Sequence, residues 1–185
     1  MSALTIIPEN EPSRPVLHSD DPEVIARELA AVGIQFERWE AAADIRAGDS
    51  PETVMAAYRE DIDRLVAQRG YQSMDVISLD GTDPATVAKV PELRQKFLSE
   101  HTHAEDEVRF FVAGRGLFSL HVEGRVYEVL CEQGDLIAVP AGTPHWFDMG
   151  PCPSFVAIRL FNNPDGWIAN YTGESIAEKF SRLES

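Results

Sequence analysis

The chain has 185 residues, of which 31 are Asp or Glu and 16 are Lys or Arg, giving a formal net charge of −15. This length corresponds to about one domain, and the charge would repel phosphate backbones and anionic lipid surfaces. No apolar run reaches the roughly 18 residues of a membrane-spanning helix, and the first ten residues do not resemble a secretory signal. We therefore expect no nucleic-acid or membrane partner, and a cytoplasmic protein whose cysteines, Cys131 and Cys152, are free thiols.

The first half of the sequence predicts helices interrupted by two short strands. Residues 1–20 are rich in proline and predict turns. Asp21-Pro22 and Ser50-Pro51 each suit a capping residue followed by the first helical position, and the apolar stripe after each pair ends at a glycine. The predicted elements are helices over residues 21–33, 50–70 and 84–98, the last interrupted or bent at Pro91, and strands over 34–40 and 74–79.

The second half has the pattern of a β-sandwich or barrel. From about residue 100, short apolar runs are separated by glycines and other turn residues at the spacing of successive strands. The predicted strands are 108–112, 117–122, 126–130, 136–139 and 155–161, followed by a helix over 175–183. We therefore expect a mainly β fold with flanking helices (α+β), in one domain spanning 1–185. Its expected parts are a helical and strand flank over 1–98, a barrel core over 99–161, and a C-terminal loop and helix over 162–185.

Histidines supply the first candidate functional residues. His101 and His103 have the i, i+2 spacing that places two imidazoles on one face of a strand, and Glu107 and Arg109 share that face if the strand continues. His145 follows a turn rich in proline and glycine. Three imidazoles and one carboxylate suit a divalent transition-metal ion, and the absence of a thiolate argues against structural zinc. Taken singly, each residue also fits an ordinary role as an exposed histidine, a surface acid or a hydrogen-bonding turn residue.

The order and spacing of these residues resemble the two sequence motifs of cupins. The first motif is His101-x-His103-x3-Glu107-x6-Gly114, and the second is Gly134-x5-Pro140-x-Gly142-x2-His145. Met149 stands where the second motif usually ends in asparagine. The resemblance implies a cupin double-stranded β-helix, or jelly-roll, barrel whose metal ligands point inward from facing strands.

A longer resemblance, from about residue 75 to residue 170, is to the acireductone dioxygenase family of cupins. It rests on the stretches 101–111, 134–148 and 157–161. It implies metal ligands at His101, His103, Glu107 and His145, which would hold one Fe(II) or Ni(II) per chain. It also implies catalytic arginines at Arg109 and Arg159, and an apolar substrate pocket formed by Phe97, Phe147 and Trp167.

The same resemblance implies a reaction. Members of the family cleave acireductone (1,2-dihydroxy-3-keto-5-methylthiopentene) with O2 in methionine salvage. The iron form gives 2-keto-4-methylthiobutyrate and formate, and the nickel form gives methylthiopropionate, formate and carbon monoxide. The expected partners are therefore a small-molecule substrate and O2, and we expect the chain to be a monomer.

Other interpretations remain open from the residues alone. Arg109 and Arg159 also suit purely structural ion pairs, Arg109 with Asp106 or another carboxylate, and the aromatic residues also suit the barrel core. A cupin isomerase acting on sugar phosphates would need a phosphate site, for which the acidic barrel segment offers little. A non-catalytic cupin that binds a metal or a small molecule is a third hypothesis. His121 is predicted to be exposed, and His18 receives no role.

Overall fold

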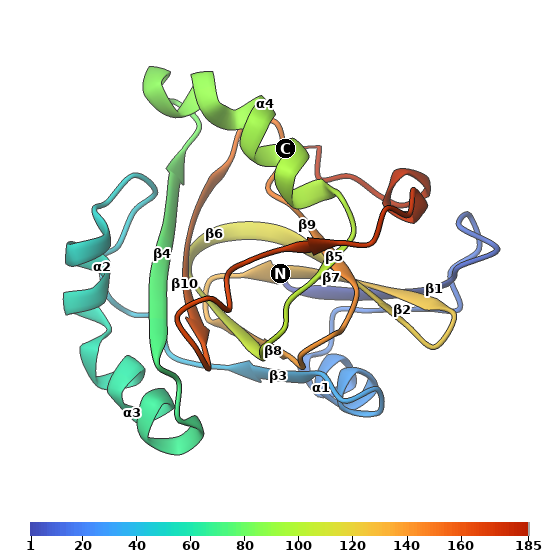
Figure 1. Ribbon diagram of the computed structural model, residues 1–185, viewed down its shortest axis with the longest axis horizontal. Coiled ribbons are helices and arrows are strands. Elements are labelled where there is room, and N and C mark those ends of the chain that lie inside the picture. Colours follow the sequence, from blue (N-terminus) through green and yellow to red (C-terminus); the bar gives the residue numbers. More distant parts are fainter. Residues whose placement is uncertain (185) are drawn as a thin grey trace.

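Strand β6 (Glu107–Val122) organises the fold of this computed structural model, in which residues 1–184 are described. Its first half pairs with β8 (Asp135–Val139) and β10 (Ser154–Phe161), and its second half pairs with β7 (Arg125–Glu132) and β9 (His145–Asp148), always antiparallel. β6 therefore passes from one face of the barrel to the other and joins the two (Figure 1).

Two glycines allow β6 to change faces. Gly114 has a φ of +66°, and a Cβ at this position would lie 1.8 Å from the carbonyl oxygen of Ser154. A Cβ on Gly116 would lie 2.3 Å from the ring of Phe147. The left-handed backbone and the neighbouring carbonyl therefore require glycine at position 114, whereas a side chain at position 116 would have to displace the Phe147 ring. The prediction of two separate strands over 108–112 and 117–122 is wrong, because these glycines bend one strand instead of ending it.

Eleven strands form the two antiparallel faces in the described residues. Along one face the order is β11-β5-β9-β6-β7-β1-β2, and along the other it is β4-β10-β6-β8-β3. The strands not yet given are β1 (Ala3–Pro8), β2 (Leu17–Ser19), β3 (Gln35–Arg38), β4 (Ser73–Asp80), β5 (His101–Thr102) and β11 (Asn170–Tyr171). Strands from the first 98 residues pair directly with strands from the second half, which supports a single domain.

The strand predictions are confirmed where a strand has its own apolar pattern. The predictions at 34–40, 74–79, 126–130, 136–139 and 155–161 coincide with β3, β4, β7, β8 and β10. The region 1–20, predicted as turns, instead contains β1 and β2. The strands β5, β9 and β11 were not predicted, because each is only two to four residues long and depends on its partner strand.

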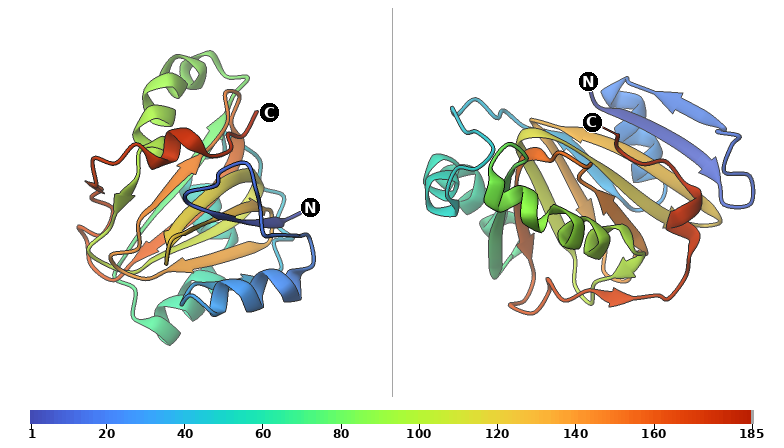
Figure 2. Two further views of the ribbon diagram at one scale, coloured as in Figure 1. Left: turned by 90° about the vertical axis from the view of Figure 1, so that its right-hand side faces the viewer. Right: turned by 90° about the horizontal axis from the view of Figure 1, so that it is seen from above.

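Helices flank the barrel and begin where the sequence predicts them. They are α1 (Pro22–Ala30), α2 (Pro51–Ala57), α3 (Arg59–Arg69), α4 (Pro84–Leu98) and the short 3-10 helix η1 (Ile176–Lys179). Asp21, Ser50 and Asp83 cap the starts of α1, α2 and α4 by accepting hydrogen bonds from backbone N–H groups. In Figures 1 and 2, α1 and α4 lie on opposite sides of the barrel.

Three helix predictions need correction. The predicted helix over 50–70 is divided at Tyr58, where the backbone leaves the helical conformation. Helix α4 is not interrupted at Pro91, because it continues from Pro84 to Leu98. The predicted terminal helix over 175–183 is reduced to η1. No helix within residues 1–184 combines the length and apolar character needed to cross a membrane.

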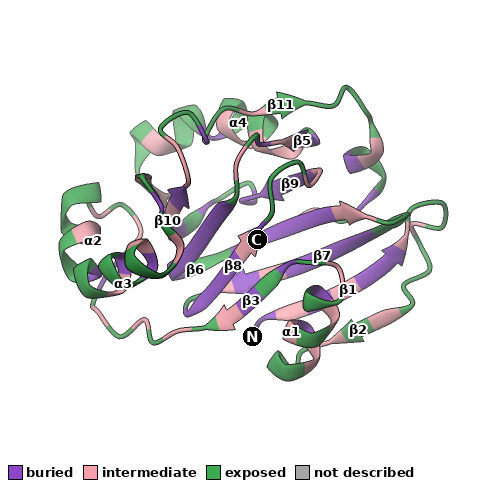
Figure 3. Ribbon diagram, turned by 60° about the horizontal axis from the view of Figure 1, so that its bottom comes forward, coloured by how far each residue is buried: buried purple, intermediate pink, exposed green. Residues whose placement is uncertain are grey.

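Alternating side chains along β6 separate two apolar layers. Val108 and Phe110 pack outward with buried residues of α2 and α3. Phe111 belongs to the apolar cluster inside the barrel, and Glu107 and Arg109 share its parity along the strand. Figure 3 shows the central strands largely buried and the helices mostly exposed. This arrangement confirms the predicted mainly β fold with flanking helices, and it directs two charged residues of β6 toward the interior.

Candidate metal centre

Three histidines converge inside the barrel. His101 lies in β5 and is paired with His145 at the start of β9. His103 follows β5, and its backbone carbonyl accepts a hydrogen bond from Gly142 in the turn before β9. One potential ligand nitrogen from each of the three rings lies within 4.8 Å of the others, and all three residues are buried. The pairing of β5 with β9 therefore brings together imidazoles that are distant in the sequence.

The Nδ1 atom of each ring fixes the orientation of the imidazole. These atoms lie 2.7–2.9 Å from backbone carbonyl oxygens, those of Ser99 for His101, Ile168 for His103 and Thr143 for His145. Because a carbonyl oxygen only accepts, Nδ1 carries the proton and donates in each ring. The lone pair of every neutral ring is therefore on Nε2, as in metal-binding histidines oriented by a backbone carbonyl.

Glu107 adds an oxygen that has no hydrogen-bond donor. Its Oε2 lies 3.1 Å from Nε2 of His103 and 3.8 Å from Nε2 of His145. Both nitrogens carry lone pairs, so each contact brings a nitrogen acceptor against the oxygen acceptor of Glu107 with no proton between them. Neither Glu107 Oε2 nor His145 Nε2 has a hydrogen-bond partner among the described residues. Acceptor atoms that face one another in a buried site fit a divalent cation with nitrogen and oxygen ligands.

No continuous strand joins His103 to Glu107, so Glu107 does not reach the histidines by the strand alternation that the sequence suggests. Residues 103–106 form a bend, and β6 begins at Glu107. Glu105 accepts a hydrogen bond from a side-chain amide, and Asp106 accepts one from a backbone N–H group. These two carboxylates therefore stabilise the bend, and Glu107 is the acidic residue of this segment that faces the histidines.

Burial and neighbouring charges set the protonation that a metal requires. Burial lowers the pKa of His145 to about 3 and also lowers the pKa of His101. Burial opposes the ionisation of Glu107, but the charge of Arg109 outweighs it and holds the Glu107 pKa well below its usual range. Neutral imidazoles and an ionised carboxylate are the states in which these groups bind metal ions.

Both arginines of the predicted site are paired with carboxylates. Arg109 is 3% exposed and donates through Nε and Nη2 to Oε1 of Glu107, at 3.2 and 2.8 Å. Arg159 donates to both oxygens of Asp75, at 2.8 and 2.5 Å. Burial opposes the charge of Arg159, but the hydrogen bonds to Asp75 outweigh it and raise the Arg159 pKa. Each arginine thus has a structural ion pair, and the partner of Arg109 is Glu107, not Asp106.

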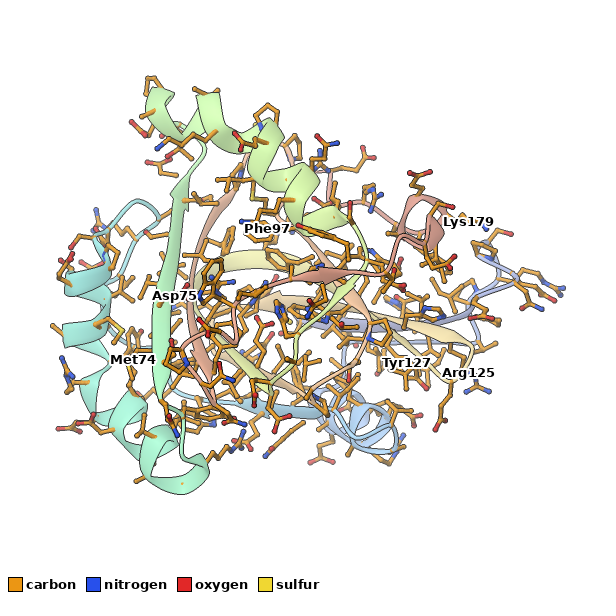
Figure 4. All side chains as sticks on the ribbon, in the orientation of Figure 1. Met74, Asp75, Phe97, Arg125, Tyr127 and Lys179 are labelled. Atoms are coloured by element: carbon orange, nitrogen blue, oxygen red, sulfur yellow. The ribbon has the colours of Figure 1, made fainter. Side chains whose placement is uncertain are left out.

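A cavity of about 360 Å³ lies beside the histidines. The predicted site residues that line it are His101, His103, Arg109, Arg159, Phe97 and Trp167. Figure 4 labels Asp75 on β4 and Phe97 near the end of α4, two elements that form walls of this cavity. Phe147 does not line the cavity: it is buried behind Phe97, with the two ring centroids 6.3 Å apart.

Four polar residues of the cavity were missed by the sequence analysis: Asp75, Ser78, Lys96 and Tyr171. Asp75 stands opposite Arg159 where β4 pairs with β10, and only that long-range pairing connects it to the site. Lys96 directly precedes Phe97. Because Phe97 is already assigned to the pocket, its neighbour could have been considered for the pocket as well. A larger hollow of about 730 Å³ beside Trp39 and Arg64 is lined by none of the clustered histidines.

Comparison with known proteins agrees with this geometry. The family model described as ARD/ARD′ matches residues 4–169. The chain belongs to the ARD/ARD′ family. It is 61% identical to acireductone dioxygenase of Stutzerimonas stutzeri over 184 residues, which is 100% of this chain and 99% of that protein. It is 58% identical to acireductone dioxygenase of Klebsiella pneumoniae over 183 residues, which is 99% of each chain.

A solved structure shares the fold of this ARD/ARD′ family member. It is acireductone dioxygenase from Bacillus anthracis with a cadmium ion in its active centre, and it is 29% identical to the present chain. The match covers 92% of this chain and 98% of that one, with a TM-score of 0.77. This likeness confirms the predicted cupin barrel. The histidine cluster fits a metal centre in this family member, and the identity of the metal stays a prediction.

Two neighbours of the metal centre in this ARD/ARD′ family member belong to the apolar packing. Trp146 is buried on the other side of β9 from His145, with its ring 6.0 Å from that of Phe180, as its opposite parity in the sequence indicates. Met149, at the motif position that usually holds asparagine, is buried in the apolar cluster inside the barrel. Neither residue lines the cavity beside the histidines.

Proposed function

We propose that this ARD/ARD′ family member is a metal-dependent dioxygenase that cleaves acireductone (1,2-dihydroxy-3-keto-5-methylthiopentene) with O2, using one Fe(II) or Ni(II) per chain. The observation that carries the proposal is the buried cluster of imidazole nitrogens and a donor-free carboxylate oxygen beside a cavity with two arginines. Similarity over the full length to proteins named acireductone dioxygenase supports the same activity. The proposal includes a role in methionine salvage, a cytoplasmic location and a monomeric state.

The polar part of the cavity suits the enediolate end of this substrate. When bound by His101, His103, Glu107 and His145, a divalent ion would supply Lewis acidity and a template for two adjacent substrate oxygens. Arg109 keeps its positive charge at any working pH, and its Nη1 has no partner among the described residues. This N–H group is therefore available to donate to an enediolate oxygen. Arg159 presents a second guanidinium to the cavity, and Asp75 fixes its orientation.

The apolar part of the cavity suits the methylthio end. Phe97 and Trp167 line this part, and Phe147 supports Phe97 from behind. Contacts between a thioether sulfur and an aromatic ring are favourable. The substrate would thus lie with its enediolate toward the histidines and its methylthio group toward the aromatic rings.

The proposal includes a different set of products for each ion. We expect the iron form to give 2-keto-4-methylthiobutyrate and formate, and the nickel form to give methylthiopropionate, formate and carbon monoxide. Both ions accept three imidazoles and one carboxylate, so this ligand set accommodates either.

The test uses purified protein that is stripped of metal and reloaded with Fe(II) or Ni(II). Substrate is mixed with the protein under anaerobic conditions, O2 is then added, and the products are identified. We expect the enediolate absorbance to disappear in the loaded protein and to persist over the same period in the metal-free protein. Persistence of the absorbance with both ions would refute the proposal, and tight metal binding without turnover would favour a non-catalytic binding protein.

A further inference from the structure

The imidazole of His121 lies between two carboxylates. Its Nδ1 is 2.8 Å from Oε2 of Glu100, and its Nε2 is 2.6 Å from Oε2 of Glu9. Ionised carboxylates only accept hydrogen bonds, so both ring nitrogens must donate, and the ring is then an imidazolium. Burial opposes this charge, but the two carboxylates outweigh it and raise the pKa of His121. The sequence predicts that His121 is exposed, but only 23% of its side chain is accessible, so the residue is half-buried.

The contacts of His121 lead to two segments that carry the clustered histidines. Glu100, which is 3% exposed, directly precedes His101. The backbone N–H of His121 donates to the carbonyl oxygen of Pro144 at 2.9 Å, and Pro144 directly precedes His145. His121 is therefore connected through its side chain to the start of β5 and through its backbone to the start of β9.

Glu100 also connects His121 to β11, whose Tyr171 lines the cavity. Its Oε1 accepts a hydrogen bond from Oγ1 of Thr172 at 2.8 Å, and its backbone carbonyl accepts one from the N–H of Thr172 at 3.1 Å. Thr172 directly follows β11, whose Tyr171 pairs with His101 and has its ring centroid 5.8 Å from the ring of His101. The carboxylate of Glu100 thus joins His121, β5 and β11 in one hydrogen-bonded network.

This network needs a positive charge. A buried carboxylate is stable only where hydrogen bonds and an opposite charge compensate for the lost hydration. Besides the imidazole of His121, the Glu100 carboxylate accepts a hydrogen bond from the neutral hydroxyl group of Thr172. Loss of the imidazolium would leave the negative charge of buried Glu100 without a positive partner in this network. The exposed Glu9 cannot take the place of the imidazolium, because Glu9 is also an anion.

We propose that His121 is a positioning residue of the metal centre: clamped between Glu9 and Glu100, it fixes the strand that presents His101 and the β11 segment beside the cavity. The inference rests on the metal centre of the proposed function. It assigns a role to a histidine that does not belong to the cluster of three and does not line the cavity.

The main test is His121→Gln, which removes the charge and keeps a polar side chain. We expect the affinity for Ni²⁺ alone to fall by about tenfold, because partners that orient metal ligands are worth about 10–100-fold in metal affinity. The visible spectrum of the Co²⁺-loaded protein should also change, since His101 is no longer held in one position. A purely structural role would lower the free energy of unfolding and leave both readouts of the folded protein unchanged, which would overturn the proposal.

His18→Gln is the matched control. His18 also makes a side-chain hydrogen bond, with Oγ1 of Thr5 at 2.9 Å, but it lies in β2 at the edge of the sheet and contacts none of the clustered histidines. Its Ni²⁺ affinity should stay within about twofold of the wild-type value, as for other surface substitutions. An equal loss in both variants would mean that the effect of His121→Gln is not specific to its network, and would also overturn the proposal.

Two measurements on the metal-free protein complete the test. Hydrogen exchange at residues 99–102 and 170–172 should be faster in His121→Gln than in the wild type, and the ring of wild-type His121 should be doubly protonated near neutral pH by ¹⁵N NMR. A neutral ring would overturn the proposal. If His121→Gln does not fold, Glu9→Gln decides, and it should shift the Ni²⁺ affinity and the exchange in the same direction by a smaller amount. Wild-type protein that binds no Ni²⁺ would refute the proposed function itself, whereas normal wild-type binding with unaffected variants refutes only the positioning role.

Discussion

Two buried carboxylate–arginine pairs of this protein differ in how completely they are hydrogen-bonded. Asp148, at the end of β9, accepts four hydrogen bonds: two from Arg94 at 2.8 and 3.0 Å, and one each from the backbone of Gly150 and Leu183 at 2.9 Å. Glu107 accepts both of its bonds from Arg109 on one oxygen, and its second oxygen has no donor among the described residues. Both carboxylates are 1% exposed.

We interpret the difference as that between an ion pair with only a structural role and one that could also serve a binding site. A buried polar atom without a partner costs about 1–3 kcal/mol, so a fold that is selected only for stability would satisfy it, as it does at Asp148. The free oxygen of Glu107 instead faces Nε2 of His145, which also has no hydrogen-bond partner among the described residues, and a cation would satisfy both atoms. Asp148 joins α4, β9 and the C-terminal segment. Under the proposed function, the free oxygen of Glu107 would bind a cation from outside the chain.

The largest effect is expected for His145→Ala, which removes one of the converging nitrogens. The affinity for Ni²⁺ should fall by more than about 100-fold, since even partners outside the ligand set are worth 10–100-fold, and turnover should be lost with the metal. Titration of the metal-free protein with Ni²⁺ and an oxygen-uptake assay check both results. His18→Ala is the control, and metal binding at the wild-type affinity in His145→Ala would contradict the ligand assignment.

Asp148→Asn should affect the opposite property. The free energy of unfolding should fall by about 3 kcal/mol, the low end for breaking a buried ion pair, because 25% of the Arg94 side chain is accessible. The folded variant should keep its Ni²⁺ affinity. Urea unfolding and metal titration measure the two quantities. Asp44→Asn, which removes an exposed pair with Arg46, is the control and should change the stability by less than about 1 kcal/mol.

The contribution of Asp148 should depend on pH with a defined sign. Burial opposes its ionisation, but Arg94 and two backbone N–H groups outweigh it and lower its pKa in the folded protein. A group with a lowered folded-state pKa stabilises above its unfolded pKa, about 3.9 for Asp, and loses that contribution as the pH falls through the folded value. The stability difference between wild type and Asp148→Asn should therefore be constant at neutral pH and shrink below about pH 4. A difference that grows on acidification would contradict this assignment.

The sequence predicts features that depend on neighbouring residues better than features that depend on residues far apart in the chain. The spacing of His101 and His103 and the turn before His145 point to the candidate metal centre, because each of these two signals is contained within a few residues, even though the two segments meet only through the pairing of β5 with β9. Nothing near Asp148 shows that Arg94 and the backbone of Leu183 will satisfy it, since these partners come from 54 and 35 residues away. The same reason explains the missed strands β5 and β11 and the missed pairing of Asp75 with Arg159. These features depend on which segments meet in the folded barrel.

Arg109→Met tests whether Arg109, the partner of Glu107, takes part in catalysis. We expect the folded variant to bind Ni²⁺ and its kcat/KM to fall by about 100-fold, the usual effect of removing a donor that stabilises a developing negative charge. The remaining side chain still fills the space over the rings of Phe118 and Phe147. Metal titration, urea unfolding and steady-state kinetics separate the outcomes. Unfolding of the variant with normal activity in its folded fraction would show that Arg109 is structural, like Arg94.

The smallest effect is expected at Lys96, which extends the comparison to the mouth of the cavity. Arg109 and Arg159 are each neutralised by a carboxylate, whereas within residues 1–184 no carboxylate lies within ion-pair distance of Lys96. In a protein of charge −15, an uncompensated cation at this position should favour the approach of an anionic substrate. Lys96→Glu should lower kcat/KM by about threefold to tenfold at low ionic strength, and by less at about 1 M salt, where charges are screened within about 3 Å. Lys89→Glu, on the same helix but outside the cavity, makes the same change in net charge, so an equal loss in both variants would attribute the effect to total charge and not to Lys96.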